Sequence, residues 1–147
     1  GGARATPHLF PADQAHGAVY HDSVESLLGV ADFLSLNCPA TPETIDLMNA
    51  ERFALMPEGA VIVNTARGAL IDEDALLGAL DTGQIAAAGL DCFKVEPGGN
   101  AAFSRYDNIF MLPHIGSATR KTRDAMGFRA LDNLDAFFAG KVPHDTL

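Results

Sequence analysis

Three side chains in this sequence could bind a small anion or carbonyl compound and exchange a proton with it. Arg67 follows the apolar run 60–66, Glu96 lies in a loop, and His114 follows Pro113 at the end of a further apolar run. The planar guanidinium of an arginine can grip a carboxylate or a carbonyl oxygen. A histidine can act as a general acid or base near neutrality. A carboxylate bonded to one of its ring nitrogens fixes the tautomer and favours the protonated ring.

Each of these residues also has a purely structural explanation. Arg67 could be a surface arginine of a strand-to-helix loop that pairs with Asp72, and position alone favours neither role. His114 could be a hydrogen-bonded loop histidine, and Glu96 could be an exposed loop acid. The sequence does not show that these two side chains meet.

Two further apolar runs end in candidate binding residues. Asp91 lies near the end of the run 85–93, where an acid is costly unless it has a partner, although it could also cap the following turn. Cys38 and Pro39 end the run 33–38 and would offer apolar surface to a flat ring, or could simply end a strand. The remaining histidines are so spaced in loops and near the termini that the sequence predicts no metal site.

The elements that must position these residues alternate between apolar and amphipathic runs. The predicted strands are 18–22, 33–38, 60–66, 85–93 and 109–113. The predicted helices are 23–31, 41–48, 50–56, 72–80 and a long helix that begins at Ser117 or Thr119 and ends near Phe138. This alternation predicts a doubly wound α/β fold, in which a parallel sheet is covered on both sides. Ligands bind beyond the carboxyl ends of such strands, so the polar residues there should meet at one edge.

Composition narrows the classes of function. The length of 147 residues predicts one domain, and a net charge of −9 argues against nucleic acid or an anionic membrane surface as a partner. No apolar stretch is long enough to span a membrane, and the N-terminal residues lack a signal-peptide pattern. Cys38 and Cys92 lie in apolar runs, which favours buried free thiols and a cytoplasmic location.

Three segments, in this order and spacing, resemble the nucleotide-binding half of the D-isomer-specific 2-hydroxyacid dehydrogenases. They are NTARGALIDEDAL, GLDCFKVEP and LPHIGSAT, and the resemblance covers residues 18–140. The segments IGSAT and NCPAT are more similar to the glyoxylate/hydroxypyruvate reductase branch than to the phosphoglycerate branch. Formate dehydrogenases of the superfamily carry glutamine at the position of Glu96, so this glutamate favours 2-hydroxy acid chemistry. The resemblance implies a Rossmann-like fold, NAD or NADP as cofactor, a small 2-oxo or 2-hydroxy acid as substrate, and a homodimer.

The resemblance also implies a role for each candidate residue. Arg67 would bind the 2-oxo-carboxylate and polarise its carbonyl, and His114 would donate the proton while Glu96 holds and charges it. Asp91 matches the acid near the nicotinamide carboxamide. Apart from Arg67, Asp91 and His114, the implied cofactor-binding residues flank the nicotinamide (Thr65, Ala66, Gly116 and Ser117) or line the adenine side (Cys38 and Pro39).

The sequence departs from the family in its length and in one motif. Family members carry a separate substrate domain and a Gly-rich phosphate-binding loop, whereas this sequence contains no Gly-x-Gly-x-x-Gly. We therefore expect residues 1–17 to be an irregular remnant, 18–140 to be the C-terminal part of an NAD(P)-binding domain without its first strands, and 141–147 to be a tail. Strand 33–38 would then lie at an edge that the N-terminal segment or another chain covers. The apolar face of the last helix would be partly bare or buried in a partner.

Two functions remain open on the sequence alone. The first is a fragment of an NAD(P)-dependent D-2-hydroxyacid dehydrogenase that is inactive by itself. The second is a non-catalytic binding or scaffold module, similar to the family's transcriptional corepressor branch, which also keeps such residues. A Rossmann-like hydrolase is disfavoured because the sequence has no Gly-x-Ser-x-Gly nucleophile motif.

Overall fold

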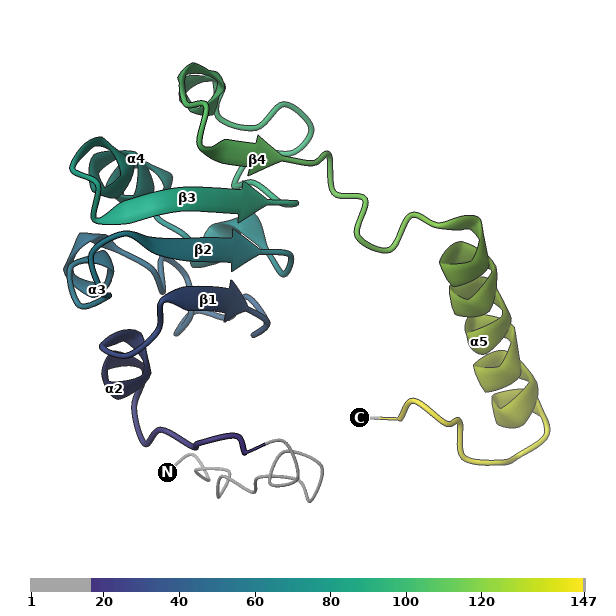
Figure 1. Ribbon diagram of the computed structural model, residues 1–147. Helices are drawn as coiled ribbons and strands as arrows, with labels where there is room; N and C mark the ends of the chain where they lie inside the picture. Colours follow the sequence, from purple (N-terminus) through teal and green to yellow (C-terminus); the bar gives the residue numbers. More distant parts are fainter. Residues whose placement is uncertain (1–16, 147) are drawn as a thin grey trace.

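The protein, seen in a computed structural model that describes residues 17–146, is built on a four-stranded parallel sheet (Figure 1). The strands are β1 (Phe33–Leu36), β2 (Ala60–Asn64), β3 (Ile85–Leu90) and β4 (Ile109–Met111), and they lie side by side in chain order. The helices are α2 (Val24–Leu28), α3 (Ala50–Phe53), α4 (Glu73–Asp81) and α5 (Arg120–Phe138), with 3-10 turns η1 (Gly68–Leu70) and η2 (Ala101–Arg105). The predicted α/β, Rossmann-like class is confirmed.

The helices begin where the sequence predicts, because each has a side chain that accepts a hydrogen bond from the free N–H groups of its first turn. The capping residues are Ser23 for α2, Asn49 for α3, Asp72 for α4 and Thr119 for α5. Thr119, rather than Ser117, therefore begins the long helix. Gly83 follows α4 with a φ of +77°, in the left-handed region where a glycine is favoured.

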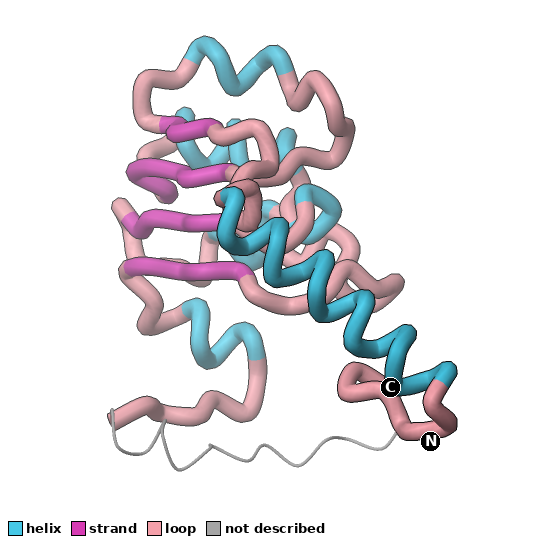
Figure 2. Tube along the Cα trace, turned by 90° about the vertical axis from the view of Figure 1, so that its right-hand side faces the viewer, coloured by secondary structure: helices cyan, strands magenta, loops and turns pink. Residues whose placement is uncertain are grey.

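The described residues cover only one face of the sheet. Because β1 to β4 follow one another in one direction across the sheet, right-handed crossovers place every connection on the same side. Phe53 of α3, Leu76 of α4 and Ile62 of β2 belong to one buried apolar cluster, and Figure 2 shows the helical turns to one side of the strands. On the other face, Phe33 is 80% and Phe110 is 67% exposed. A second covered face requires strands that continue the sheet in the opposite direction, and no strand does so within residues 17–146.

The predicted strand 18–22 is wrong: these residues form an irregular segment that is mostly exposed. An extended segment becomes a strand only when a neighbour pairs with it, and no described strand lies beside this one. For the same reason β1 is an edge strand whose only described partner is β2. The N-terminal segment that we expected to cover this edge lies outside the described residues, as does nearly all of the predicted remnant 1–17.

The predicted helix 41–48 is also wrong, and turns replace it. The hydroxyl of Thr44 accepts the N–H of Thr41 and donates to the carbonyl of Pro39, so local side-chain bonds compete with a helical ladder. The end of segment 41–48 makes a long-range contact instead, in which the N–H of Met48 donates to the carbonyl of Leu70. Met48 is fully buried, and this tertiary contact outweighs the helix-start pattern.

All four strands are shorter at the carboxyl end than the apolar runs that predicted them. β2 ends at Asn64 rather than residue 66, and β3 ends at Leu90 rather than residue 93. The residues removed from the strands in this way include the candidate binding residues Cys38, Thr65, Ala66 and Asp91. The candidate site therefore lies in the loops that follow the carboxyl ends of the strands.

Helix α5 lies beyond the carboxyl ends of the strands and contributes no buried residue (Figure 1). Its exposed apolar side chains are Met126, Phe128, Leu131, Leu134, Phe137 and Phe138. This confirms the expectation of a partly bare apolar face. The following residues fold back on the helix, because the carboxylate of Asp145 accepts hydrogen bonds from Arg129 and Asn133. No helix among residues 17–146 is both long and apolar enough to cross a membrane.

Candidate active site

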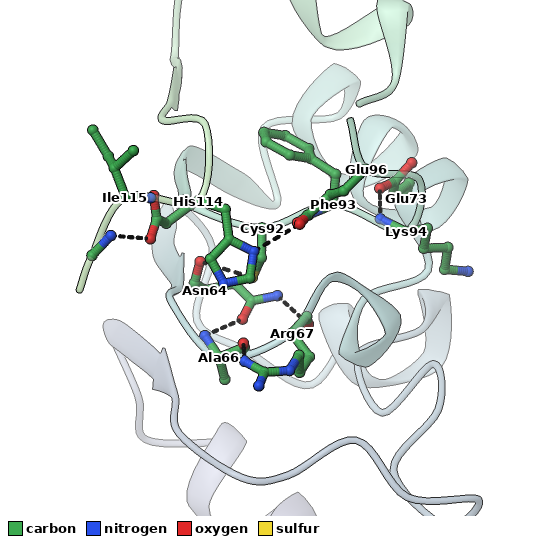
Figure 3. Close-up of polar contacts among 12 residues, drawn as sticks. Asn64, Ala66, Arg67, Glu73, Cys92, Phe93, Lys94, Glu96, His114 and Ile115 are labelled. Atoms are coloured by element: carbon green, nitrogen blue, oxygen red, sulfur yellow. Dashed lines mark hydrogen bonds and ion pairs between the residues drawn. The ribbon is translucent and has the colours of Figure 1, made fainter. Parts of the chain in front are cut away.

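The candidate residues gather at the carboxyl edge of the sheet, as the strand ends predict. Figure 3 shows Arg67 in the loop after β2, Glu96 in the loop after β3, and His114 in the segment that follows β4. The three come from three successive strand ends, which parallel pairing holds side by side. The sequence could name these residues, and the sheet brings their loops together.

The loop that carries Arg67 is shaped by a buried amide. Asn64 is fully buried, its Nδ2 donates to the carbonyl of Arg67 at 2.8 Å, and its Oδ1 accepts the N–H of Ala66 at 3.1 Å. Both polar ends of the amide are therefore used on the backbone of one tight turn. The guanidinium of Arg67 is exposed, and within the described residues its one hydrogen bond goes from Nη1 to the carbonyl of Ala66 at 2.6 Å. It keeps most of its donors for a ligand.

Glu96 and His114 form the contact that the sequence could not establish. Nδ1 of His114 lies 2.7 Å from Oε2 of Glu96, and Oε1 of Glu96 accepts the N–H of Phe93 at 2.7 Å. Both side chains are partly exposed. Because the carboxylate occupies Nδ1, the Nε2 atom is the ring nitrogen left for a reacting group, and it makes no hydrogen bond within residues 17–146. This is the geometry of an oriented general acid–base.

The pKa of Glu96 lies below its usual value. The hydrogen bond with His114 is the largest cause, the N–H of Phe93 adds to it, and the positive charge of Arg67 contributes. Each of these interactions favours the carboxylate over the acid. Glu96 is therefore a permanent negative partner for His114 at neutral pH.

Asp91 fixes the backbone that follows His114. Its Oδ1 accepts the N–H of Ile115 at 2.8 Å, and its Oδ2 accepts the N–H of Gly116 at 2.7 Å. A Cβ atom at Gly116 would lie 2.9 Å from Oδ2, so this close approach favours glycine. His114 itself has a φ of +55°, a left-handed conformation that is uncommon outside glycine. The clamp holds the chain in that conformation and so aims the imidazole.

The loops of Arg67 and Glu96 also touch each other through their backbones. A Cβ atom at Gly68 would lie 1.9 Å from the carbonyl carbon of Phe93 and 2.4 Å from the nitrogen of Lys94. The peptide between these two residues leads directly into the loop of Glu96. Gly68 thus sets how closely the proposed anchor and the acid–base pair approach.

The remaining candidates lie at the same edge with fewer contacts. Cys38 is half-buried against the core at the end of β1, and Pro39 beside it is exposed. Thr65 and Ser117 are exposed, which leaves them free to meet a ligand. Both cysteines are free, as predicted. Burial, followed by the charges of Glu96 and Asp91, raises the pKa of the Cys92 thiol to about 11, so this thiol is inert at neutral pH.

A cavity of about 650 Å³ opens beside the acid–base pair. Glu96 and His114 form part of its wall, and the apolar side chains of Phe93, Met111 and Leu112 form another part. Arg67 is not among the residues that line this cavity.

Sequence reasoning did not predict the contacts of two supporting residues, Asn64 and Glu73. Asn64 is a polar residue inside the apolar run 60–66, and only its burial shows that both ends of its amide must bond the backbone of the turn. Glu73 lies at the acidic start of the predicted helix 72–80, yet its carboxylate accepts the N–H of Lys94. No local pattern marks that contact, since the two residues are far apart in the sequence.

Known proteins resemble this chain in sequence and in structure. Residues 5–116 match the profile of the family described as D-isomer specific 2-hydroxyacid dehydrogenase, NAD binding domain. A glycerate dehydrogenase from Hyphomicrobium methylovorum is 44% identical over 128 residues, which are 87% of this chain and 40% of that protein. The chain therefore spans well under half the length of this relative.

Solved structures agree with the sequence comparison. The holo form of D-mandelate dehydrogenase from Rhodotorula graminis has a TM-score of 0.89 at 32% identity, over 98% of this chain and 43% of that one. An NADPH-dependent glyoxylate/hydroxypyruvate reductase from Sinorhizobium meliloti, in complex with NADP and malonate, has a TM-score of 0.79 at 38% identity. That match covers 83% of this chain and 38% of the reductase.

The close approach at Gly68 generates a first prediction. In the Gly68→Ala variant the new methyl group overlaps the Phe93–Lys94 peptide, and we expect a loss of roughly 1–3 kcal/mol in the free energy of unfolding. The matched control is Gly78→Ala in α4, where no atom lies within 4 Å and alanine should stabilise the helix by roughly 0.5–1 kcal/mol. Urea unfolding of the chain measures both. Equal effects of the two substitutions would show that the loops do not press on each other.

The hydrogen bond between His114 and Glu96 generates a second prediction. The folded-state pKa of Glu96 lies below its ordinary value of 4.5, so its interactions stabilise the fold above that pH. This contribution is lost as the pH falls through the folded-state pKa. In His114→Ala we expect the pKa of Glu96 to rise toward 4.5, measured by carbon NMR of its side-chain carboxyl during an acid titration. His21→Ala, whose ring contacts Ser26 instead, is the control and should leave that pKa unchanged. An unchanged pKa in His114→Ala would contradict the contact.

Proposed function

Because the chain belongs to the D-isomer specific 2-hydroxyacid dehydrogenase family, by the NAD binding domain of that family, we propose that the complete gene product is an NAD(P)-dependent oxidoreductase. It transfers a hydride between NAD(P)H and the carbonyl carbon of a small 2-oxo acid, and a D-2-hydroxy acid is the product. The observation that carries the proposal is the 2.7 Å contact between Glu96 and His114 at the same edge as Arg67.

Arg67 is the proposed anchor of the substrate. Its guanidinium is exposed, and the turn held by Asn64 fixes the backbone beneath it. A planar fork of donors matches the two oxygens of a carboxylate, and its charge also polarises the neighbouring carbonyl. Reduction of that carbonyl develops negative charge on its oxygen, which a fixed cation stabilises.

His114 is the proposed proton donor. Its Nδ1 faces Glu96, so Nε2 delivers the proton to the carbonyl oxygen while the hydride adds to the carbonyl carbon. A bound dinucleotide would supply the hydride that reduces the 2-oxo acid. In the reverse direction the same Nε2 accepts the hydroxyl proton. Glu96 stabilises the charged ring, which must be protonated before reduction.

The residues present fit the nicotinamide end of a dinucleotide, which supplies or accepts the hydride when it is bound. Each oxygen of Asp91 holds one backbone N–H and has a further lone pair, so the carboxylate can still accept from an amide group. Thr65, Ala66, Gly116 and Ser117 would contact this end, and Cys38 with Pro39 would line the adenine side. The sequence contains no Gly-rich loop for the phosphates, so we expect the isolated chain to bind dinucleotide weakly and not to turn over.

The family and the chemistry of the site support the proposed substrate class. A carboxylate next to a carbonyl satisfies Arg67 and His114 together, and an apolar wall leaves room for a short side chain. The reductase from Sinorhizobium meliloti was crystallised with malonate, a small dicarboxylate. We propose glyoxylate and hydroxypyruvate as the first substrates to test, and a homodimer as the assembly. No contact in the described residues specifically favours the scaffold alternative.

The test of this function is reduction of a panel of 2-oxo acids by the complete gene product. Glyoxylate, hydroxypyruvate and pyruvate are each assayed with NADH and with NADPH by loss of absorbance of the reduced coenzyme. We expect turnover of at least one acid, and a product of the D configuration on chiral analysis where the product is chiral. No turnover of any acid with either coenzyme, combined with tight binding to a protein, would support the scaffold function instead.

The role of Arg67 generates a further prediction. Arg67→Lys keeps the charge but loses the planar fork, so we expect kcat/KM to fall roughly ten- to a hundredfold, since a charge-assisted hydrogen bond contributes about 1.5–3 kcal/mol. Arg105→Lys, on the exposed part of η2, is the matched control and should keep the parental kinetics. If Arg67→Lys turns over like the parent, the arginine does not anchor the substrate.

A further inference from the structure

Glu73, the first residue of α4, reaches out of its helix to the loop that carries Glu96. Its Oε1 accepts the backbone N–H of Lys94 at 2.9 Å, and its Oε2 accepts Nδ2 of Asn100 at 3.1 Å. Lys94 and Asn100 lie on either side of Glu96, so one carboxylate ties down both ends of the loop. Figure 3 shows Glu73 facing the backbone of Lys94 beside the Glu96 loop.

The loop has few other contacts that would hold it in place. Its residues 94–98 are exposed, and Val95 is 67% exposed although it is apolar. Within the described residues, the other contacts include an ion pair from Lys94 to Asp46, a backbone bond from Gly99 to Val95, and the packing of Phe93 on Phe103. The Phe93–Lys94 peptide also lies against Gly68, and Glu96 bonds Phe93 and His114. None of these joins both ends of the loop to a rigid element. Glu73 does, because it stands on a helix whose own cap is Asp72.

Helix stability alone does not account for this arrangement. An acid in the first turn interacts favourably with the helix dipole whichever acid it is, and Asp74 supplies one at the next position. The Asp74 side chain is exposed and makes no hydrogen bond in the described part of the chain. Glu73 instead uses both of its oxygens on groups 21 and 27 residues further along. This is the pattern of a side chain that orients a functional loop.

We propose that Glu73 is a positioning residue, which holds the 94–100 loop so that the carboxylate of Glu96 meets Nδ1 of His114. The catalytic consequence rests on the proposed function, whereas the positioning itself does not. Glu73 touches neither of the two paired side chains and acts through the backbone N–H of Lys94 and the side-chain amide of Asn100.

The positioning is tested by carbon NMR titration of the Glu96 carboxyl in the 147-residue chain, because charge and geometry then act in opposite directions. In Glu73→Ala, removal of a negative charge would by itself lower the pKa of Glu96 further. Loss of positioning would weaken the hydrogen bonds from His114 and Phe93, and would raise that pKa toward its ordinary value of 4.5. We expect the rise. A fall or no change overturns the proposal.

Two variants separate positioning from charge and from folding. Asp74→Ala removes the same charge from the same helical turn without touching the loop, so the pKa of Glu96 should not rise in it. Glu73→Gln keeps the size of the side chain and one acceptor oxygen, so we expect a rise smaller than in Glu73→Ala. If Glu73→Ala does not fold, the Glu73→Gln variant decides alone, and an unchanged or lowered pKa in it overturns the proposal.

The complete gene product separates this inference from the proposed function. With an active parent, Glu73→Ala should lower kcat about tenfold or more, a part of the roughly 10²–10⁴-fold that a positioned acid supplies, with little change in KM because Arg67 is undisturbed. If the pKa of Glu96 rises in Glu73→Ala but the parent protein reduces no 2-oxo acid, the positioning role is supported and the proposed function is contradicted. If the Glu73→Ala protein is active with the kcat of the parent, the positioning role is contradicted and the proposed function is retained.

Discussion

Two buried polar side chains at neighbouring strand ends determine the shape of the candidate site. Asn64 and Asp91 are nearly inaccessible to water, and each unsatisfied buried group would cost about 1–3 kcal/mol. Within the described residues their partners are backbone groups, and these lie in the turn of Arg67 and in the segment after His114. Satisfying the two side chains therefore folds the chain into the conformation that presents the two functional residues. The stability of the sheet edge and the geometry of the site have the same cause.

The single direction of winding explains why these loops converge. Strands β1 to β4 follow in order, so their connections lie on one face and their carboxyl ends lie on one edge. The core on the covered face can then be apolar throughout, while the polar residues are concentrated at the edge. Polar groups outside that core are placed by hydrogen bonds rather than by packing. This is why Glu96, on a mostly exposed loop, depends on contacts as specific as those to Phe93 and His114.

Much of the fold could be predicted because its causes are local. A side chain that caps a helix, such as Asp72, and a glycine that ends one, such as Gly83, act on residues only a few positions away. The errors have non-local causes. The prediction of helix 41–48 was wrong because the backbone N–H of Met48 bonds the distant carbonyl of Leu70. The prediction of strand 18–22 was wrong because a strand needs a neighbouring strand, which the periodicity of a sequence does not reveal. The other predicted strands were all too long at the carboxyl end, because an apolar run does not show where its backbone stops pairing with a neighbouring strand.

The candidate site also has a part that the sequence could predict and a part that it could not. The residue types at the strand ends, and their resemblance to a family, were sufficient to name Arg67, Glu96 and His114 before any contact was known. Their mutual geometry was not predictable, because His114 meets Glu96 across 18 residues and has a left-handed backbone conformation that is uncommon outside glycine.

An exposed ion pair of this kind contributes little stability by itself, since water screens its charges. The charge attraction of the pair is therefore not sufficient to hold the imidazole in place, and the surrounding hydrogen bonds must add to it. The clamp of Asp91 on Ile115 and Gly116 holds the chain on one side of His114, and the turn of Asn64 holds the neighbouring loop. The orientation of the functional side chains at this edge of the sheet is thus determined by the conformation of the backbone loops that carry them.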